Sequence, residues 1–148
     1  IVPTSCKNGT NIDTLRDMLV SELHDEVMYY PSGDLTDRSM RYVAAETIRE
    51  KALLFLQDEI PHGIGVIINI YDEKKETLVI EADVVCEKES HKPIIVGEGG
   101  SMIKRISESA RRELEARTGK RVHIRLFVKV REDWRNRKTY MRDLGYED

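Results

Sequence analysis

The sequence has few of the features that mark secreted or membrane-spanning proteins. Its only two cysteines, Cys6 and Cys86, lie far apart, which argues against a disulfide framework and against a zinc cluster with ordinary ligand spacing. Cys86 ends an apolar run, so we expect it to be buried as a small hydrophobic residue. No run approaches the roughly 18 consecutive apolar residues of a membrane span, and no segment has the layout of a signal peptide. We therefore expect a cytoplasmic protein.

Histidines are equally sparse. The chain has four, they are scattered, and none lies beside a plausible nucleophile in the sequence. We therefore predict no catalytic residue and no metal site, and we expect packing or solvent roles for His24, His62, His91 and His123.

The net charge of −3 conceals an uneven distribution of charge along the chain. Residues 1–90 carry 9 Lys or Arg and 18 Asp or Glu, whereas residues 91–142 carry 15 and 6. A basic segment of this kind is typical of a surface that binds a polyanion. It is equally compatible with a solvated face that balances acidic residues elsewhere, so charge alone does not choose between the two interpretations.

The first part of the chain is too small to fold alone. Ile1–Thr4 is expected to be the end of a strand, and Asn11 is expected to cap a helix whose apolar residues follow helical spacing. A proline and a glycine then break the periodicity, which predicts a linker at residues 29–36 between residues 1–28 and a domain at residues 37–148. Because the chain begins with isoleucine, we expect it to be a piece of a longer polypeptide.

Residues 37–148 show the pattern of an α+β domain. Val66–Ile70 is almost continuously apolar and β-branched, which predicts a central strand that is covered on both sides. Leu78–Cys86 alternates apolar and polar residues, which predicts a half-exposed strand. The predicted order is helix, strand, strand, short helix, helix, strand, with boundaries at about 37 or 39 to 57, 66–70, 78–86, 94–96, 101–118 and 122–130.

A glycine-rich loop, Gly97-Glu98-Gly99-Gly100, lies between two predicted helices. A G-x-x-G at this place lets the backbone turn tightly and leaves no side chains at its ends to hold a sugar-phosphate chain away. Its N–H groups and the N-terminus of the following helix can face phosphate oxygens. The spacing suits a polyanion, but G-x-x-G alone is a weak signal, because many turns between helices are rich in glycine.

The residues around the loop resemble the signature of the KH family. Ile94-Ile95-Val96 precedes the loop and Ile103-Lys104-Arg105-Ile106 follows it, as aliphatic residues and an Ile-Lys-x-Ile pattern do in that family. The order of elements resembles the type II arrangement, which implies a three-stranded mixed sheet with three helices on one face. The resemblance also implies that the loop clamps single-stranded RNA. The RNA-binding residues that it implies are Lys92, Ile94, Ile95, Gly97, Glu98, Gly99, Gly100, Ile103, Lys104 and Arg105.

The resemblance also predicts how RNA would bind. Glu98 departs from the family, in which this part of the loop usually carries a basic residue, so backbone N–H groups, helix polarity and flanking cations would hold the phosphates. The bases are expected in a groove between the glycine-loop helices and the edge of the second strand, with aliphatic residues including Val84–Cys86 as its floor. Plain core packing is the alternative for most of these aliphatic residues. Arg125, Lys129 and Arg131 are expected to have solvated or partner-facing roles.

Further stretches resemble the Era family of bacterial GTPases. Ala44–Lys51 resembles the first KH helix of that family, and Val128–Arg135 resembles a stretch near its end. Ser5-Cys6-Lys7 resembles the Ser-Ala-Lys motif that closes over the guanine base in small GTPases. The resemblance covers essentially the whole chain. It implies that residues 1–28 are the C-terminal remnant of an α/β GTPase domain, with its last strand, guanine-motif loop and last helix, and that residues 37–148 are a type II KH domain.

The Era resemblance implies a function for the fragment and for its parent. The fragment is expected to bind the single-stranded 3′ end of 16S ribosomal RNA, to act in assembly of the small ribosomal subunit, and to bind no DNA. GTP and Mg²⁺ would belong to the parent, because no G-x-x-x-x-G-K-[ST] loop occurs in this chain to cradle phosphates, so the fragment itself should not hydrolyse GTP. The resemblance also implies peripheral contact with the inner face of the cell membrane. The alternative is a KH-like module that docks proteins and has little RNA affinity.

Overall fold

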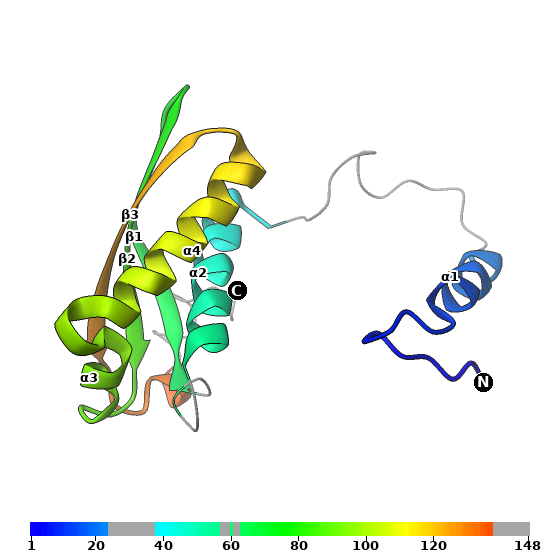
Figure 1. Ribbon diagram of the computed structural model, residues 1–148, viewed down its shortest axis with the longest axis horizontal. Helices are drawn as coiled ribbons and strands as arrows, with labels where there is room; N and C mark the ends of the chain where they lie inside the picture. Colours follow the sequence, from blue (N-terminus) through cyan, green and yellow to red (C-terminus); the bar gives the residue numbers. More distant parts are fainter. Residues whose placement is uncertain (24–37, 57–59, 61–62, 138–148) are drawn as a thin grey trace. The chain divides into compact units, whose positions relative to one another are not determined.

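The computed structural model describes residues 1–23, 38–56, 60 and 63–137 (Figure 1). The chain divides into two compact units, Ile1–Asp37 and Arg38–Asp148. The predicted linker at residues 29–36 lies outside the described residues, as do Gln57, where the first long helix was expected to end, and two of the four histidines, His24 and His62.

The first unit contains one helix, α1 (Ile12–Ser21), within its described residues. Asn11 occupies the predicted N-cap position, but it adopts a left-handed conformation with φ 56°, and its side chain makes no capping hydrogen bond within the described residues. Instead, its Nδ2 donates a hydrogen bond to the Pro3 carbonyl, 2.9 Å away. The predicted strand at Ile1–Thr4 is also not formed, because the described part of this unit offers only an isolated bridge between Ser5 and Thr10.

The second unit follows the predicted order of elements. Ser39 accepts a hydrogen bond from the backbone N–H of Tyr42 and thereby starts the first long helix. Gly119, in the left-handed conformation with φ 68°, ends the last helix. The elements are α2 (Met40–Phe55), β1 (Gly65–Glu73), β2 (Thr77–Cys86), α3 (His91–Val96), a short 3-10 turn η2 (Glu98–Gly100), α4 (Ser101–Thr118), β3 (Arg121–Val130) and a second 3-10 turn η3 (Trp134–Asn136).

The sheet has the strand order β1-β2-β3, which confirms a three-stranded mixed sheet. β1 pairs antiparallel with β2, and β2 pairs parallel with β3. Two predictions about the strands are therefore wrong. The apolar strand around Val66–Ile70 is an edge strand, in which Ile70 is 45% exposed, and the strand predicted to be half-exposed is the central one. Hydrophobicity did not distinguish them, because β1 gains its burial from α2 and from η3 rather than from a second neighbouring strand.

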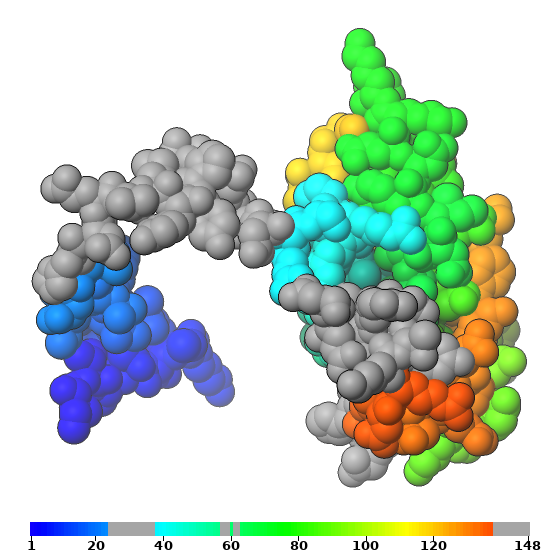
Figure 2. Space-filling model, turned by 180° about the vertical axis from the view of Figure 1, so that it is seen from behind, coloured from blue at the N-terminus to red at the C-terminus, as the bar shows by residue number. Residues whose placement is uncertain are grey.

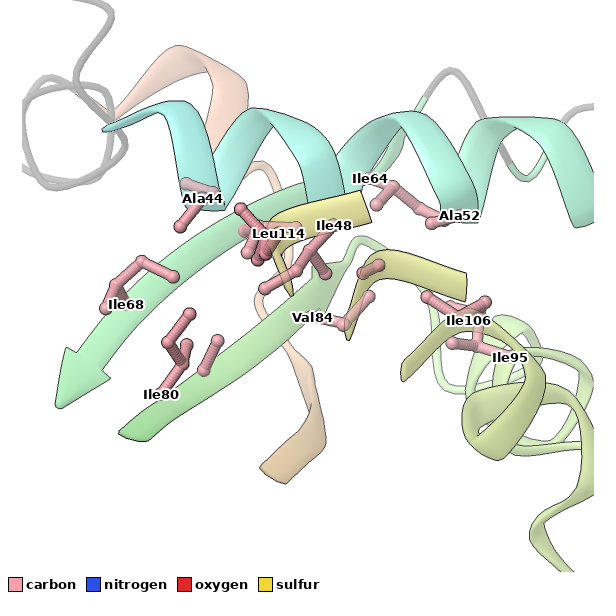
Figure 3. Packing of buried hydrophobic residues seen from close by; sticks show 14 of the residues in the cluster. Ala44, Ile48, Ala52, Ile64, Ile68, Ile80, Val84, Ile95, Ile106 and Leu114 are labelled. Carbon is pink, nitrogen blue, oxygen red and sulfur yellow. The ribbon is translucent and has the colours of Figure 1, made fainter. Parts of the chain in front are cut away.

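The helices cover one face of the sheet, as predicted. On β2 the alternate residues Leu78, Ile80, Ala82 and Val84 are fully buried beneath α2 and α4 (Figures 1 and 3). The complementary helix positions share the helical spacing of a buried stripe, and they are Ala44, Ile48 and Ala52 on α2 and Ile106, Ala110 and Leu114 on α4. One apolar layer therefore holds the helices against the strands.

The opposite face of the sheet is covered at one end by the segment after β3. Trp134 is 4% exposed, packs with Val85 and Ile67, and donates a hydrogen bond from Nε1 to the Gly63 carbonyl at 3.1 Å. Arg135, one residue later, forms an ion pair with Glu87 at 2.8 Å. The tryptophan explains why Val85, on the face away from the helices, is buried.

The hairpin of β1 and β2 is irregular and long. Its register shifts between Ile68 and Ile70, and the Arg41 guanidinium donates a hydrogen bond to the Ile68 carbonyl at this bulge. The turn closes with a hydrogen bond from the Lys74 N–H to the Thr77 carbonyl, and the tip projects beyond the rest of the unit (Figure 2). Among the residues that the structure describes, none of the helices combines the length and apolar character needed to span a membrane.

A largely buried lysine joins α2 to α4. Lys51 is 9% exposed, and its Nζ lies 2.5 Å from Glu113 Oε2 and 2.7 Å from Glu50 Oε1. The hydrogen bond from Lys51 holds the pKa of Glu113 below its ordinary value, with Arg117 adding to the effect. The same contact raises the pKa of Lys51. This ion pair is a specific contact between the two long helices that cover the sheet.

Replacing Glu113 by glutamine is expected to lower the free energy of unfolding by about 1–2 kcal/mol at pH 7, because the lysine loses its closest charged partner. A carboxyl group with a lowered pKa in the folded state stabilises the fold above its ordinary pKa of 4.5, and this stability is lost as the pH falls through the folded value. The difference between wild type and Glu113→Gln should therefore shrink in denaturant unfolding at pH 3. Glu108→Gln, on the same helix but 4.0 Å from an exposed Lys104, is the matched control and should be nearly neutral. An equal loss at both pH values would contradict this explanation.

Candidate nucleic-acid interface

The glycine loop begins where α3 ends. Gly97 follows Val96 with φ 76° and ψ 168°, and its N–H donates to the Pro93 carbonyl at 2.8 Å. A Cβ on Gly97 would lie 2.7 Å from both Cβ and N of Met102, closer than packing permits. This position therefore requires glycine for two reasons, a positive φ and the close approach of α4.

The other two glycines of the loop differ from Gly97 in what surrounds them. Gly99 and Gly100 also have positive φ, 57° and 80°, but a Cβ on either would meet no atom within 4 Å. Their role in packing is small, and the space over them is open. The loop therefore presents bare backbone, which a sugar-phosphate chain can approach closely.

The loop leads directly into the N-terminus of α4. Gly100 occupies the cap position and has no side chain to accept a hydrogen bond from the first turn. The first N–H groups of a helix have no acceptor within the helix, and the helix dipole adds partial positive charge there. The end of an 18-residue helix and the glycine loop together form a site suited to an anion.

The predicted cations lie on different sides of this site. Lys92 is exposed on α3, and Lys104 is exposed on α4, 4.0 Å from Glu108. Arg105 is also exposed, but its guanidinium lies over the ring of Phe55 at 4.2 Å from the centroid, which places it on the side of α4 that faces α2. All three cations remain predicted phosphate contacts, and Arg105 would make its contact from the side of α4 that faces α2.

The edge of the sheet beside the loop belongs to β3, not to the second strand as predicted. β2 is central and has both edges paired, whereas both α3 and α4 contact β3. The predicted floor at Val84–Cys86 is wrong, because these three residues are at most 1% exposed and belong to the core. Ile95 is likewise fully buried and cannot present its side chain to a ligand.

The side chains that are accessible at this edge come from α3, α4 and β3. Ile94 is 51% exposed, and Ile103, Leu126 and Val128 are partly buried against the core. They form an apolar strip along which bases can pack. The structure thus brings the predicted Ile94 and Ile103 to the edge and adds Leu126 and Val128, which sequence reasoning missed.

The backbone of β3 directs hydrogen-bonding groups toward the same edge. Arg121 and Arg131 donate from their N–H groups to the carbonyls of Glu76 and Cys86. The backbone N–H and C=O groups of odd-numbered residues in β3 therefore point toward β2. The backbone groups of even-numbered residues point away from β2, toward the edge of the sheet, because successive residues of a strand alternate. The Ile124 carbonyl accordingly accepts from Ser107 Oγ at 3.4 Å. The backbone N–H and C=O groups of Leu126 and Val128 likewise point outward at the edge, beside the apolar strip.

A cavity of about 320 Å³ lies farther along this edge, between α4 and β3. Ser107, Glu108 and Arg111 line it from α4, and His123 and Ile124 line it from β3. Near it, Glu115 accepts a hydrogen bond from the Val122 N–H at 3.2 Å and one from Arg111 at 2.9 Å. These two contacts hold the pKa of the Glu115 carboxyl below its ordinary value. Polar and charged side chains therefore line this end of the edge, whereas apolar side chains line the end beside the glycine loop.

Residues 59–135 match the family model of the KH domain. The chain belongs to the KH domain family. The match includes α3, the glycine loop, α4 and all three strands, so the edge described above is the edge of a KH domain. The predicted KH resemblance and the type II order of elements are thereby confirmed.

The chain is also similar to Era proteins over its whole length. It is 44% identical over 149 residues to GTPase Era of Clostridium botulinum and 46% identical over 147 residues to GTPase Era of Clostridium acetobutylicum. These matches cover 100% and 99% of the chain, and 50% of each relative. The chain therefore spans about half the length of the curated relatives it matches, and the predicted Era resemblance is confirmed for that half.

Two solved Era structures match the KH chain with a TM-score of 0.93 and 38% identity. One is Aquifex aeolicus Era bound to GDP·AlF4⁻, and the other is Era in complex with MgGDPNP and nucleotides 1506–1542 of 16S ribosomal RNA. Each match covers 100% of this chain and 50% of the solved chain. The fold of both units therefore has a counterpart in Era.

The predicted guanine motif lies in the first unit, away from the KH residues in sequence. Ser5 is partly buried and donates its N–H to the Thr10 carbonyl at 3.2 Å, while Cys6 and Lys7 are exposed in the turn between them. A turn of this kind can present backbone N–H groups to a base oxygen. The role of these three residues in binding guanine stays a prediction.

Proposed function

We propose that this chain binds single-stranded RNA between the glycine loop and the edge of β3. One observation carries the proposal: the bare backbone at Gly99 and Gly100 lies at the N-terminus of α4, beside a strand whose Leu126 and Val128 direct backbone groups outward. Phosphate would be held at the loop and bases would pack along the apolar strip. KH domains bind about four nucleotides in this way.

Each part of the site would contribute a different interaction. The loop and the first turn of α4 supply N–H donors and partial positive charge for phosphate oxygens. Ile94, Ile103 and Val128 supply apolar surface against which a base can lie without sequence preference. The outward backbone groups of β3 can read the hydrogen-bonding edges of bases, which gives the site its sequence preference.

We further propose that the preferred RNA is the 3′ end of 16S ribosomal RNA and that the chain acts, as part of a longer protein, in assembly of the small ribosomal subunit in the cytoplasm. The support is the whole-length similarity to Era, one structure of which contains nucleotides 1506–1542 of that RNA. GTP and Mg²⁺ would be bound by the part of an Era-like parent that contains a phosphate-binding loop. From the Era resemblance we also propose peripheral contact of that parent with the membrane surface.

A titration of the 148-residue chain tests the central proposal. A fluorescently labelled single strand with the 3′-terminal 16S sequence should bind, and its affinity should fall as the salt concentration rises, because phosphates release counterions on binding. An RNA duplex of the same sequence should compete poorly. Failure of the chain to bind any single strand at low salt would contradict RNA binding and favour the protein-docking alternative.

Glu98→Lys is expected to tighten RNA binding by about tenfold. The side chain is exposed in the loop, so the substitution exchanges a repulsive charge beside the phosphates for an attractive one, worth roughly 1–2 kcal/mol in a largely solvated site. Glu76→Lys is the matched control, because it makes the same change of charge in the exposed turn of the β1–β2 hairpin. Equal tightening in both variants would show a general effect of net charge and not a contact at the loop.

A further inference from the structure

The face of the sheet opposite the helices carries a basic strip along β3. The odd-numbered residues of this strand point to that face, and all five within the strand are exposed. Phe127, at 42% exposure, lies among them as a large apolar side chain on the surface. The other members are positively charged or can become so, and they are Arg121, His123, Arg125 and Lys129.

This strip is continuous with the proposed RNA groove, because β3 is an edge strand. Leu126 and Val128, whose backbone groups point outward, are the direct neighbours of Phe127 in the chain. Successive side chains of a strand point to opposite faces, so one residue separates the groove from the strip. An RNA strand that leaves the groove can therefore pass over the edge and meet Phe127 without crossing another element.

The charges favour a polyanion at the end of the strip near the loop. Lys129 forms no ion pair with any described residue, and it lies opposite Val85 in the β2–β3 register. Arg125 is paired with Glu81 at 2.6 Å, so part of its charge is neutralised. Asp83, which lies directly opposite Phe127 in the ladder, is on β2, on the side of Phe127 away from the edge.

We propose that Phe127 and Lys129 form a second RNA contact on the open face of the sheet. A base of the strand that leaves the groove stacks on the Phe127 ring, and an adjacent phosphate lies by the Lys129 ammonium group. The ligand is single-stranded RNA longer than the roughly four nucleotides held at a glycine loop. This inference rests on the proposed function, because it concerns the same strand after it leaves that groove.

The test compares Phe127→Ala with Ile70→Ala in binding an RNA of about ten nucleotides and one of about four. Ile70 is the matched control, since it is 45% exposed on β1, away from the β3 edge. Phe127→Ala should weaken the longer RNA by about tenfold, as removal of a stacking platform does, and should leave the shorter RNA unchanged. Ile70→Ala should bind both as wild type does. Amide chemical shifts of residues away from the basic strip should match those of the wild type, which would confirm that both variants remain folded.

Lys129→Ala provides an independent readout. For the longer RNA, the slope of the logarithm of affinity against the logarithm of salt concentration should fall by about 0.7, the value for one phosphate of a single strand. Equal affinities of Phe127→Ala and Ile70→Ala for the longer RNA, with an unchanged slope in Lys129→Ala, would overturn the second contact while leaving the groove intact. Absence of binding of both RNAs to the wild type would overturn the proposed function and this inference with it.

Discussion

The Gly99→Asp/Gly100→Asp double variant is expected to lose about a hundredfold of its affinity for single-stranded RNA and to remain folded. Both positions have open space where a Cβ would lie, so the added side chains meet no neighbouring atom. Aspartate tolerates the left-handed backbone better than most residues. Two carboxylates facing the phosphates would oppose binding by about 3 kcal/mol together, which corresponds to the hundredfold loss.

The control for this prediction is Gly99→Asn/Gly100→Asn, which has the same shape and backbone tolerance without the charge. It should keep much of the RNA affinity in a fluorescence-polarisation titration, and thermal unfolding should show similar stability for both double variants. If the aspartate and asparagine variants bind equally well, phosphate does not approach the loop. If both lose binding completely, bulk and not charge decides.

Gly97 should behave differently from the other two glycines. Its Cβ would lie 2.7 Å from Met102, so alanine there must shift α4 or the end of α3 and would impair folding as well as binding. A glycine-loop variant is therefore informative about RNA only at the second and third glycines. The motif alone does not reveal this distinction, because all three residues are glycine in the sequence.

Trp134→Ala is expected to lower the free energy of unfolding of the second unit by about 3–5 kcal/mol, the range for removing a buried aromatic side chain. The ring is 4% exposed, packs on Val85 and Ile67, and donates a hydrogen bond to the Gly63 carbonyl. Loss of the ring would expose Val85 and Ile67, on the face of the sheet opposite the helices, to water. Because domains are typically stable by only about 5–15 kcal/mol, chemical denaturation should detect the change easily.

Trp134→Phe separates packing from hydrogen bonding. Phenylalanine keeps most of the apolar contact but cannot donate to Gly63, so the loss should be about 1–2 kcal/mol, from the missing hydrogen bond and the smaller ring. RNA affinity, measured well below the unfolding transition, should change little in either variant, because Trp134 lies on the face away from the groove. A Trp134→Ala variant as stable as the wild type would contradict the view that this residue belongs to a core.

Both proposed RNA contacts include residues of β3, and this links the two RNA predictions. The loop variants test the face with the helices, and Phe127→Ala tests the open face. If the loop variants bind as the wild type does, RNA does not lie at the glycine loop. If only Phe127→Ala binds as the wild type does, RNA binds through the groove alone. The edge position of β3 makes both contacts accessible to one strand.

The sequence predicted most of the elements because their signals are local. Ser39 precedes an amphipathic helix, Gly119 ends another, and the alternation from Val122 to Val130 matches β3 almost to the residue. The glycine loop was likewise visible from its place between two helices. Local signals failed where they were ambiguous, as at Asn11, whose side chain bonds to Pro3 instead of capping α1.

The order of the strands was decided by tertiary structure. Val66–Ile70 was expected to be central because it is almost wholly apolar, yet β1 is at the edge and β2 is central. An apolar side chain is buried equally well by a helix, by a neighbouring strand or by a tryptophan from a distant segment, so hydrophobicity does not report which neighbour is present. This error moved the expected groove from β3 to β2 and placed Val84–Cys86 in its floor.

The sequence by itself thus determined the KH fold, its glycine loop and its similarity to Era, because periodicity, caps and motifs are properties of neighbouring residues. Only the tertiary structure decided which strand edge adjoins the loop, that Gly97 alone among the loop glycines is held by packing, and that Trp134 belongs to a core. Those facts depend on pairs of residues far apart in the chain, such as Trp134 with Gly63 and Lys51 with Glu113. Their contacts arise only when the sheet and helices pack together.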